Sequence, residues 1–531
     1  MADGARAWPR ARGVVALGLV LAFGLAGCQR YQPMPLDLHA HRAAVQDRLA
    51  DARSLAAEDA RAAALLAEHA PDAPQRFDPS DGLTPAEGEV LALFFNPDLR
   101  QARLRAGAAL ATYQTAGRWE DPVFGFDGAQ VLAGGGALDA GLTLGLTLPI
   151  SGSLRAEKRR ALAAHQAELS ALADAQWATR MQVRRAWSAW SISVQRCDAY
   201  ERALDRAQRL ADRSRRLVSL GELTRAQARM LETVVLLARV RLGQAQAQRD
   251  RDRLELLGLM GLSPNADVRL LPAAAPLTPA DRRVLAEALA AVPSPGEPLP
   301  AAFGGVQDPD GADAPGGPEG ALIERLLEAN TTLAVERAQY RLAERALRAE
   351  IRRQYPDLTI GTGFGRESHE DRLLLGVSIP IPILNANAQG IARARADRAI
   401  AMAKAQSALE RAVGALSAGV WAYRAADRRY ELYREHLVPT LEAQLAEQEA
   451  LAELGQVDLL LLVESVDRLS EAHSEMLDAR LERTLAALEV VELLGPEPTA
   501  DDGRPANLQA KATPADDRGA QAPAARRETM P

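Results

Sequence analysis

Residues 142–149 read Leu-Thr-Leu-Gly-Leu-Thr-Leu-Pro, so large apolar side chains alternate with small or polar ones. Residues 358–364 (Leu-Thr-Ile-Gly-Thr-Gly-Phe) and 373–379 (Leu-Leu-Leu-Gly-Val-Ser-Ile) repeat the pattern, and residues 123–126 begin a fourth, less regular segment. A period of two is typical of β-strands, whose successive side chains point to opposite faces. One greasy and one polar face over about ten residues indicates a barrel strand between lipid and a wet interior.

The four segments are too few to make a barrel on their own. Even the smallest outer-membrane barrels have about eight strands, and open sheet edges are not tolerated in lipid. The chain is therefore expected to oligomerise, with residues 134–136 and 367–371 as hairpin loops. Three copies would give a 12-stranded barrel, whereas two would give eight strands around a lumen filled by side chains. Trp119 and Tyr355, just before two strands, are expected in an aromatic belt at the membrane boundary.

Long helical patterns occupy most of the remaining chain. Residues 154–219 and 391–453 are uninterrupted, and at 1.5 Å per residue each would be about 95–100 Å long. Returning helices are predicted over residues 225–257 and 458–494, so that each long helix forms an antiparallel hairpin. Apolar residues spaced by three and four along the second helix indicate a coiled-coil seam. Pro439 should kink that helix.

The landmarks of the chain occur twice. Pro122 and Pro356, each at the start of a strand, are 234 residues apart, and so are Gly221 and Gly455, which interrupt the helices. A shared offset at distant landmarks indicates an internal two-fold repeat. The first copy is assigned to residues 90–262 and the second to 321–495. Residues 263–320, rich in Pro, Gly, Ala and Asp, are expected to form a linker or equatorial segment with short local structure.

The N-terminus resembles a secretory signal sequence. Arg6, Arg10 and Arg12 precede an apolar run that ends in Leu-Ala-Gly-Cys at residues 25–28. The run is shorter than a membrane-spanning helix, so residues 1–27 are interpreted as a lipoprotein signal peptide and Cys28 as the lipidated residue. The alternative is a buried cysteine after an uncleaved anchor. Residues 28–89 would follow the lipid, and residues 496–531 are expected to be a disordered tail.

Composition and motifs argue against catalysis. The net charge of −7 is spread over both signs, which gives no basic stripe for nucleic acid. No P-loop, dinucleotide fingerprint, nucleophile elbow or HExxH sequence occurs, so the protein is expected not to be an enzyme and to need no cofactor. No metal site is predicted: His39 with His41, and the loop around His369, are the conceivable ligand clusters and are interpreted as solvated surface.

Several short motifs, in order and twice over, resemble the TolC-like outer-membrane efflux proteins. They are Asn96-Pro97-Asp98-Leu99, the strands that end in Leu148-Pro149 and Ile379-Pro380-Ile381-Pro382, and the two glycine turns. The resemblance covers residues 90–494 and, with Cys28, implies an outer membrane factor lipoprotein. It implies a mainly α homotrimer, in which a transmembrane β-barrel crosses the outer membrane and a helical barrel extends into the periplasm. A periplasmic adaptor and an inner-membrane pump would open its closed tips.

Two details are similar to the heavy-metal-efflux branch of the Czc and Cus type. They are Pro149-Ile150-Ser151-Gly152 before the first long helix, and Pro382-Ile383-Leu384-Asn385 with Gly390-Ile391 before the second. This resemblance implies a pump of the resistance-nodulation-division type. The cargo would be metal ions or small toxic compounds and would be chosen mostly by the pump.

The resemblance also assigns candidate site residues at the helix turns. Adaptor docking is implied for Leu217, Leu220, Gly221, Thr224, Leu451, Leu454, Gly455 and Asp458. Family members often carry acidic residues six and nine positions after the second tip glycine, which are Leu461 and Glu464 here. Glu464 is therefore expected to ring a closed entrance, and residues 459–461 to add an apolar constriction. The alternatives are ordinary helix–helix loops and a solvated glutamate.

The sequence thus favours a passive conduit from periplasm to exterior. A conduit for type I protein secretion shares every feature above. A lipid-anchored periplasmic coiled-coil scaffold, or an efflux adaptor, would explain the helices but would leave the four alternating strands without a purpose.

Overall fold

A computed structural model describes residues 31–58, 82–130, 138–273, 277–292, 318–367, 370–453 and 458–496 of the chain. The chain divides into two compact units, residues 1–48 and 49–531, and helix α2 (Leu38–Glu58) spans the boundary. In the first unit the side chain of Asp37 accepts hydrogen bonds from the backbone N–H groups of His39 and Ala40, both at 2.9 Å, at the start of α2. Among the described residues, no helix has the length and apolarity needed to cross a membrane.

Four antiparallel strands form one sheet in the order β1-β2-β3-β4, which confirms the four predicted strands. The strands are β1 (Val123–Gln130), β2 (Leu138–Leu148), β3 (Leu358–Glu367) and β4 (Glu370–Ser378). Residues 134–136, the first predicted hairpin loop, lie outside the described residues. The second predicted loop, 367–371, is shorter than expected because Glu367 pairs with Glu370 and Arg366 with Asp371. The strand ladder therefore continues to the edge of the turn.

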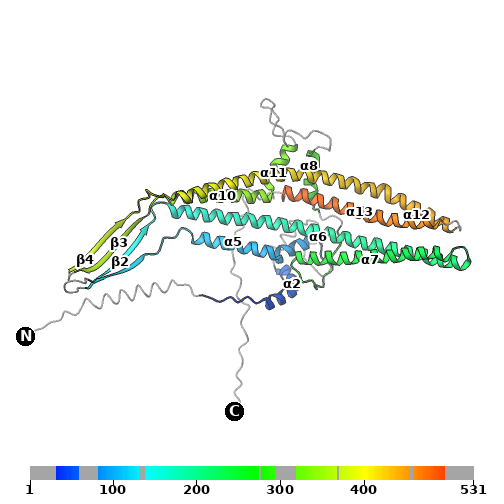
Figure 1. Cartoon of the computed structure of the whole chain (residues 1–531), viewed down its shortest axis with the longest axis horizontal. Helices are drawn as coiled ribbons and strands as arrows, with labels where there is room; N and C mark the ends of the chain where they lie inside the picture. The colour runs from blue at the N-terminus through cyan, green and yellow to red at the C-terminus, as the bar shows by residue number, and fades with distance from the viewer. Residues whose placement is uncertain are drawn as a thin grey trace, which may run out of the picture. The chain divides into compact units, whose positions relative to one another are not determined.

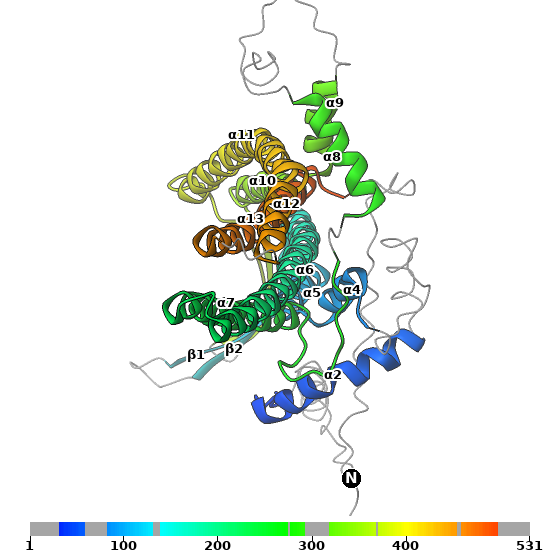
Figure 2. The same cartoon turned by 90° about the vertical axis from the view of Figure 1, so that its right-hand side faces the viewer.

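Each strand is joined to a long helix, and these four helices pack in a row (Figure 1). The row is α5 (Pro97–Thr115), α6 (Ser153–Leu220), α10 (Thr331–Arg352) and α11 (Ala388–Leu432), with α6 packed between α5 and α10 and with α10 against α11. Helix α7 (Arg225–Leu259) returns beside α6, and α13 (Leu459–Leu494) returns beside α11 and α12 (Figure 2). At 68 residues, α6 is about 100 Å long. The protein is therefore mainly helical, as predicted.

The second long helix is irregular just before Pro439. A π-helical turn (Tyr433–Leu437) separates α11 from α12 (Val438–Glu453), and the Val438 N–H donates to the Tyr433 carbonyl five residues back. Proline has no N–H to donate to the carbonyl of Glu435, four residues earlier, and its ring would crowd that carbonyl. The helix accommodates the proline by widening the preceding turn, a recognised cause of helix bending. The interruption predicted at Pro439 thus takes the form of a π-turn.

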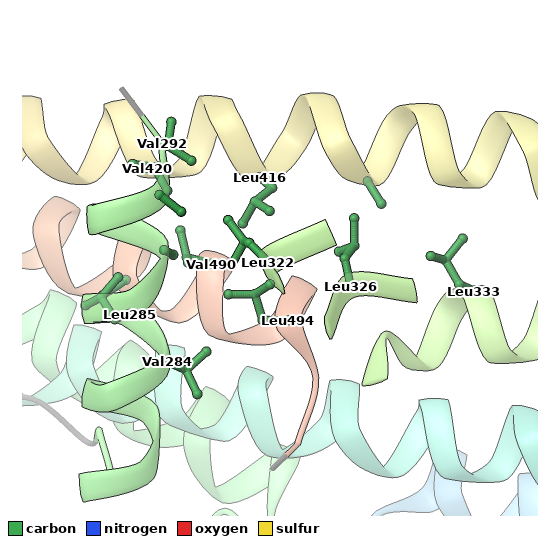
Figure 3. Packing of buried hydrophobic residues seen from close by; sticks show 14 of the residues in the cluster. Val284, Leu285, Val292, Leu322, Leu326, Leu333, Leu416, Val420, Val490 and Leu494 are labelled. Atoms are coloured by element: carbon green, nitrogen blue, oxygen red, sulfur yellow. The ribbon is translucent and has the colours of Figure 1, made fainter. Parts of the chain in front are cut away.

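Short helices pack around the middle of the long ones and form the core. They are α4 (Pro85–Phe95), α8 (Pro279–Ala291) and α9 (Pro318–Ala329). One apolar cluster joins Trp187, Leu256 and Met260 to α4. A second joins α8 and α9 to α11 and α13 through Val284, Leu285, Leu322, Leu326, Leu416, Val420, Val490 and Leu494 (Figure 3). Burying a leucine or valine fully stabilises the fold by about 1.5–3 kcal/mol.

The segment 263–320, expected to be a linker or equatorial segment with short local structure, packs into the core where it is described. Val268 and Leu270 belong to the first cluster. Helix α8 supplies four buried side chains to the second, and Val292, just after its end, supplies a fifth. Leu270 also forms a parallel bridge with Leu83. Helix α9 begins at Pro318, three residues before the boundary assigned from sequence. This part of the chain is a component of the core, because its apolar residues cover the long helices where those helices alone would expose their seams.

Candidate functional site

The sheet has one continuous apolar face. Leu144 lies opposite Phe124 on β1 and Thr362 on β3, and Ile360 lies opposite Leu146 and Val377. In an antiparallel ladder, directly opposed residues share a face. The register therefore places these side chains together: Phe124, Phe126, Leu142, Leu144, Leu146, Leu148, Leu358, Ile360, Phe364, Leu373, Leu375 and Val377.

The opposite face of the sheet is mostly small and polar, with Val123 and Leu374 as its large apolar side chains. Its residues include Thr143, Gly145, Gly361 and Gly376, and Thr147 and Thr359 place their hydroxyl oxygens 3.5 Å apart. The apolar face is largely uncovered within this chain, with Leu375 78% and Phe126 70% exposed. Strands β1 and β4 form the two edges of the sheet. In water, a monomer would therefore leave the apolar face uncovered and the backbone hydrogen-bonding groups of both edge strands unpaired.

The first candidate docking turn, between α6 and α7, is built by its own capping residues. Gly221 ends α6 with φ +80°, in the left-handed region that glycine adopts without strain. The N–H of Glu222 donates to the Leu217 carbonyl at 3.0 Å, which satisfies one of the last carbonyls of α6. Thr224 then caps α7 in a capping box with Gln227. Leu220 is left 71% exposed, so this turn presents an apolar side chain to solvent.

The second candidate turn is described only in part. Asp458 caps α13, because its carboxylate accepts from the N–H groups of Leu460 at 3.1 Å and Leu461 at 3.2 Å. Leu451 is 38% exposed. Leu454 and Gly455 lie outside the described residues. The docking role of both turns remains a prediction.

The two gate candidates occupy the first two turns of α13. Leu461 is half-buried, whereas Leu460 is 65% exposed. Glu464 is exposed and forms an ion pair with Arg468, one helical turn later, with 2.5 Å between Oε1 and Nη2. This pairing places a positive charge beside the predicted acidic ring.

The two helical hairpins are joined near these turns. An apolar cluster contains residues from α6, α7, α12 and α13, among them Leu210, Leu231, Leu445 and Leu462. Arg241 on α7 and Asp467 on α13 add an ion pair across the hairpins, with 2.6 Å between Nη1 and Oδ1. Movement of α13 relative to α7 would break this contact. Its energy is modest, since both side chains are partly exposed.

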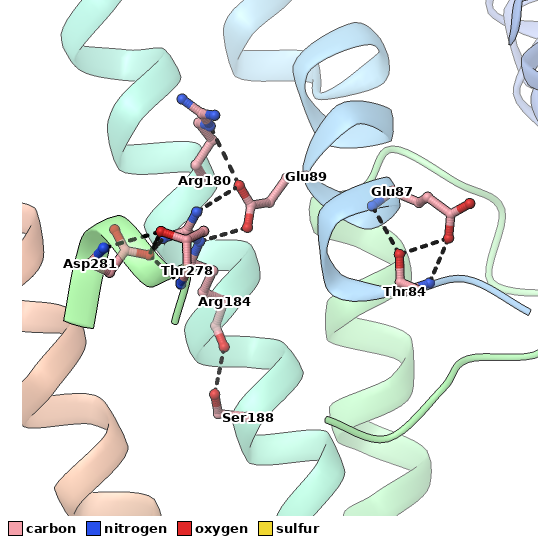
Figure 4. A network of polar contacts seen from close by, with 8 residues as sticks. All are labelled: Thr84, Glu87, Glu89, Arg180, Arg184, Ser188, Thr278 and Asp281. Atoms are coloured by element: carbon pink, nitrogen blue, oxygen red, sulfur yellow. Dashed lines mark hydrogen bonds and ion pairs between the residues drawn. The ribbon is translucent and has the colours of Figure 1, made fainter. Parts of the chain in front are cut away.

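A buried network of charges, which sequence reasoning missed, joins three helices in the middle of the molecule (Figure 4). The Arg184 guanidinium on α6 donates to Glu89 on α4 at 2.6 and 3.2 Å and to Asp281 on α8 at 2.8 Å. Arg180 lies 3.4 Å from the second Glu89 oxygen. Burial alone lowers the pKa of Arg184, but the two carboxylates outweigh it and raise that pKa. Two cations and two anions therefore neutralise one another inside the fold.

Two asparagines of the core make equivalent contacts. The Asn96 side-chain amide donates to the Leu259 carbonyl at 3.0 Å, and that of Asn330 donates to the Leu493 carbonyl at 2.7 Å. Two residues beyond each acceptor is a glycine with φ near +70°, Gly261 and Gly495. A Cβ on either would lie within 2.3 Å of a carbonyl oxygen, so both positions require glycine. All three positions in one set precede those in the other by 234 residues.

The remaining sequence candidates are placed as follows. His39 and His41 are exposed on α2, and no cluster of metal-ligating side chains is found among the described residues. His369 and Cys28 lie outside them. Cys197 is buried, and burial raises the pKa of its thiol, so the thiolate needed for reaction is disfavoured.

Comparison with known proteins gives a consistent result. Residues 90–262 match the family model described as outer membrane efflux protein. The cobalt-zinc-cadmium resistance protein CzcC of Cupriavidus metallidurans is 34% identical over 112 residues, 19% of this chain and 27% of that protein. The chain thus aligns with about a quarter of the curated relative's length.

Solved structures of similar fold extend further along the chain. That of CusC has a TM-score of 0.60 at 15% identity and covers 77% of this chain and 92% of the other. The outer-membrane channel OprN also has a TM-score of 0.60, at 16% identity, and covers 88% and 98% respectively. These identities establish the fold only, whereas the family model matches the sequence of residues 90–262. Residues 90–262 thus match the outer membrane efflux protein family, and the long helices and four-stranded sheet give the chain the fold of the TolC-like channels.

Proposed function

We propose that the protein is the outer-membrane channel of a tripartite efflux system, a passive conduit from periplasm to exterior. Three copies would join β1 of one to β4 of the next and close a 12-stranded barrel. The observation that carries the proposal is the sheet itself, with one apolar face, one polar face and two unpaired edges. Closure satisfies both edges, and lipid covers the apolar face.

The helices would form the periplasmic part of the conduit. At about 100 Å, α6 is far longer than a globular domain needs. Its turn at Gly221 lies at the opposite end of α6 from β2, so the exposed Leu220 would face the periplasmic adaptor. An inner-membrane pump supplies the energy in this arrangement, which agrees with a chain that carries no catalytic motif.

The chain is interpreted as a duplicated unit, residues 90–262 and 321–495 around the segment 263–320. The paired asparagine contacts of Asn96 and Asn330, with the paired glycines Gly261 and Gly495, support this interpretation independently of the sequence landmarks. Duplication explains why one chain supplies two strand pairs and two helical hairpins. Lipidation of Cys28 after removal of residues 1–27 is part of the proposal, and would hold the N-terminus at the outer membrane.

Metal ions are the proposed cargo, with a pump of the resistance-nodulation-division type. The similarity to a cobalt-zinc-cadmium resistance protein supports this choice over a protein secretion conduit. Deletion of the gene should increase sensitivity to cobalt, zinc or cadmium. Unchanged metal sensitivity, together with loss of a secreted protein, would favour the secretion alternative.

Purified full-length protein in planar bilayers tests the channel itself. A trimer that conducts ions is expected. A monomer that carries no current would favour the lipid-anchored scaffold, in which only the attached lipid enters the membrane.

A further inference from the structure

A basic cavity lies where the strands meet the helices. It has a volume of about 1150 Å³ and lies between the end of α5, the start of α6 and the end of α10. Six cationic side chains line it, and no carboxylate does: Arg155, Lys158, Arg159, Arg345, Arg348 and Arg352. A concave site with one sign of charge focuses the field on an ion of the opposite sign.

Few of these charges are neutralised by neighbours. Arg348 pairs with Glu344 at 3.2 Å, Lys158 lies over the Tyr113 ring, and Arg352 lies over the Tyr355 ring. Glu157, which lies between Arg155 and Lys158 in the sequence of α6, pairs with Arg160 and Arg353 instead. Among the residues that the structure describes, none forms an ion pair with Arg155, Arg159 or Arg345. Like charges gathered at this density repel one another and favour an anion among them.

The cavity is lined by three segments of one chain: the one that leads into β1, the one that follows β2 and the one that leads into β3. Strand β4, which would pair with β1 of the next copy, contributes none of the described lining residues. If α6 supercoils at 3.5 residues per turn, as the helices of the proposed helical barrel would, Arg159 and Trp187, which are 28 residues or four heptads apart, lie on the same side of it. Helix α4 covers that side at Trp187. Since an open conduit cannot hold α4 in its lumen, this is the outer side.

The cavity also lies at the membrane boundary. Trp119 and Tyr355 line it and are 58% and 52% exposed, and the apolar face of the sheet begins directly beyond it. Exposed aromatic rings beside cations are typical of the headgroup region of a bilayer. We propose that this cavity binds the phosphate of an anionic phospholipid headgroup in the periplasmic leaflet of the outer membrane. The inference rests on the proposed channel function, which fixes where the membrane lies.

Native mass spectrometry of the full-length trimer tests the site. Titration with phosphatidylglycerol, a lipid with a net negative charge, should give saturable binding, whereas zwitterionic phosphatidylcholine should bind far more weakly. The double variant Arg159→Gln/Arg345→Gln should lose roughly twenty-five-fold in phosphatidylglycerol affinity, about fivefold for each cation. The control Arg393→Gln/Arg395→Gln removes the same charge from exposed positions at the start of α11, the end of that helix that follows β4. It should bind phosphatidylglycerol like the wild type.

Three outcomes would overturn the proposal. They are equal affinity for the two lipids, equal losses in the two double variants, and binding of inorganic phosphate alone that displaces the lipid, which would assign the site to a free anion. Conductance is measured on the same preparations. A conducting wild-type trimer with any of these outcomes refutes the lipid site alone, whereas absence of trimer and current refutes the channel.

Discussion

An arginine at Leu144 tests which face of the sheet meets lipid. Leu144 is 46% exposed and lies on the apolar face, whereas its neighbour Gly145 lies on the polar face. We compare Leu144→Arg with Gly145→Arg, which add the same charge one residue apart. A Cβ at Gly145 would meet only the Val123 carbonyl oxygen, at 3.8 Å, so the control side chain has room.

The size of the effect follows from the position of Leu144 along β2. The strand has 11 residues, so it is about 36 Å long and, tilted by about 40°, rises roughly 28 Å, close to the hydrocarbon thickness. Leu144 is the seventh residue and lies near the midplane. Arginine there costs about 2–4 kcal/mol per protomer, or about 6–12 kcal/mol for three copies. Gly145→Arg faces water and should avoid this cost.

The assay is refolding of the trimer into liposomes, followed by urea titration of its dissociation. Leu144→Arg should lower the midpoint strongly or prevent assembly, and Gly145→Arg should assemble with altered conductance. The assignment of faces would be refuted if the two variants assembled equally well, or if Gly145→Arg were the more disruptive.

Three further substitutions test the helical part. Arg184→Met leaves Glu89 charged and buried, which should destabilise the protein by about 3–5 kcal/mol in thermal melts; a cost below about 1 kcal/mol would contradict the burial of this network. Asp467→Asn breaks the contact with Arg241, worth about 0.2–1 kcal/mol in each protomer, and should raise the ratio of open to closed channel in single-channel records by up to about fivefold for each protomer that moves; no change would exclude this contact from gating. Glu464→Ala should reduce cation preference, and unchanged selectivity would remove Glu464 from the gate.

Much of the fold was predictable because its elements have strong periods. The alternation at 142–148 predicts β2, and the chain of helix-forming residues before Gly221 predicts α6 within one residue at either end. Both are local properties. The strand alternation also predicts the apolar face, since the pairing register follows from keeping apolar residues together.

The middle of the molecule was harder to predict because its contacts join distant residues. Arg184 is 95 residues from Glu89 and 97 from Asp281, so no local pattern relates them. The start of α8 could have been predicted from the segment rich in Pro, Gly, Ala and Asp, because Thr278-Pro279-Ala280-Asp281 carries the signals of a helix start. The sequence shows a proline at 439 but does not predict the π-turn before it, because a helix can either break or widen at a proline.

The central claim is that identical neighbours complete the sheet, and cross-linking of β1 to β4 tests it most directly. The variant Asp127→Cys/Gly376→Cys, in a Cys197→Ala background, places one thiol on each edge strand, both on the polar face. With a bis-maleimide in intact outer membranes, covalent dimers and trimers should form, and neither single-cysteine variant should give trimers. Monomers alone from the double variant would contradict the account.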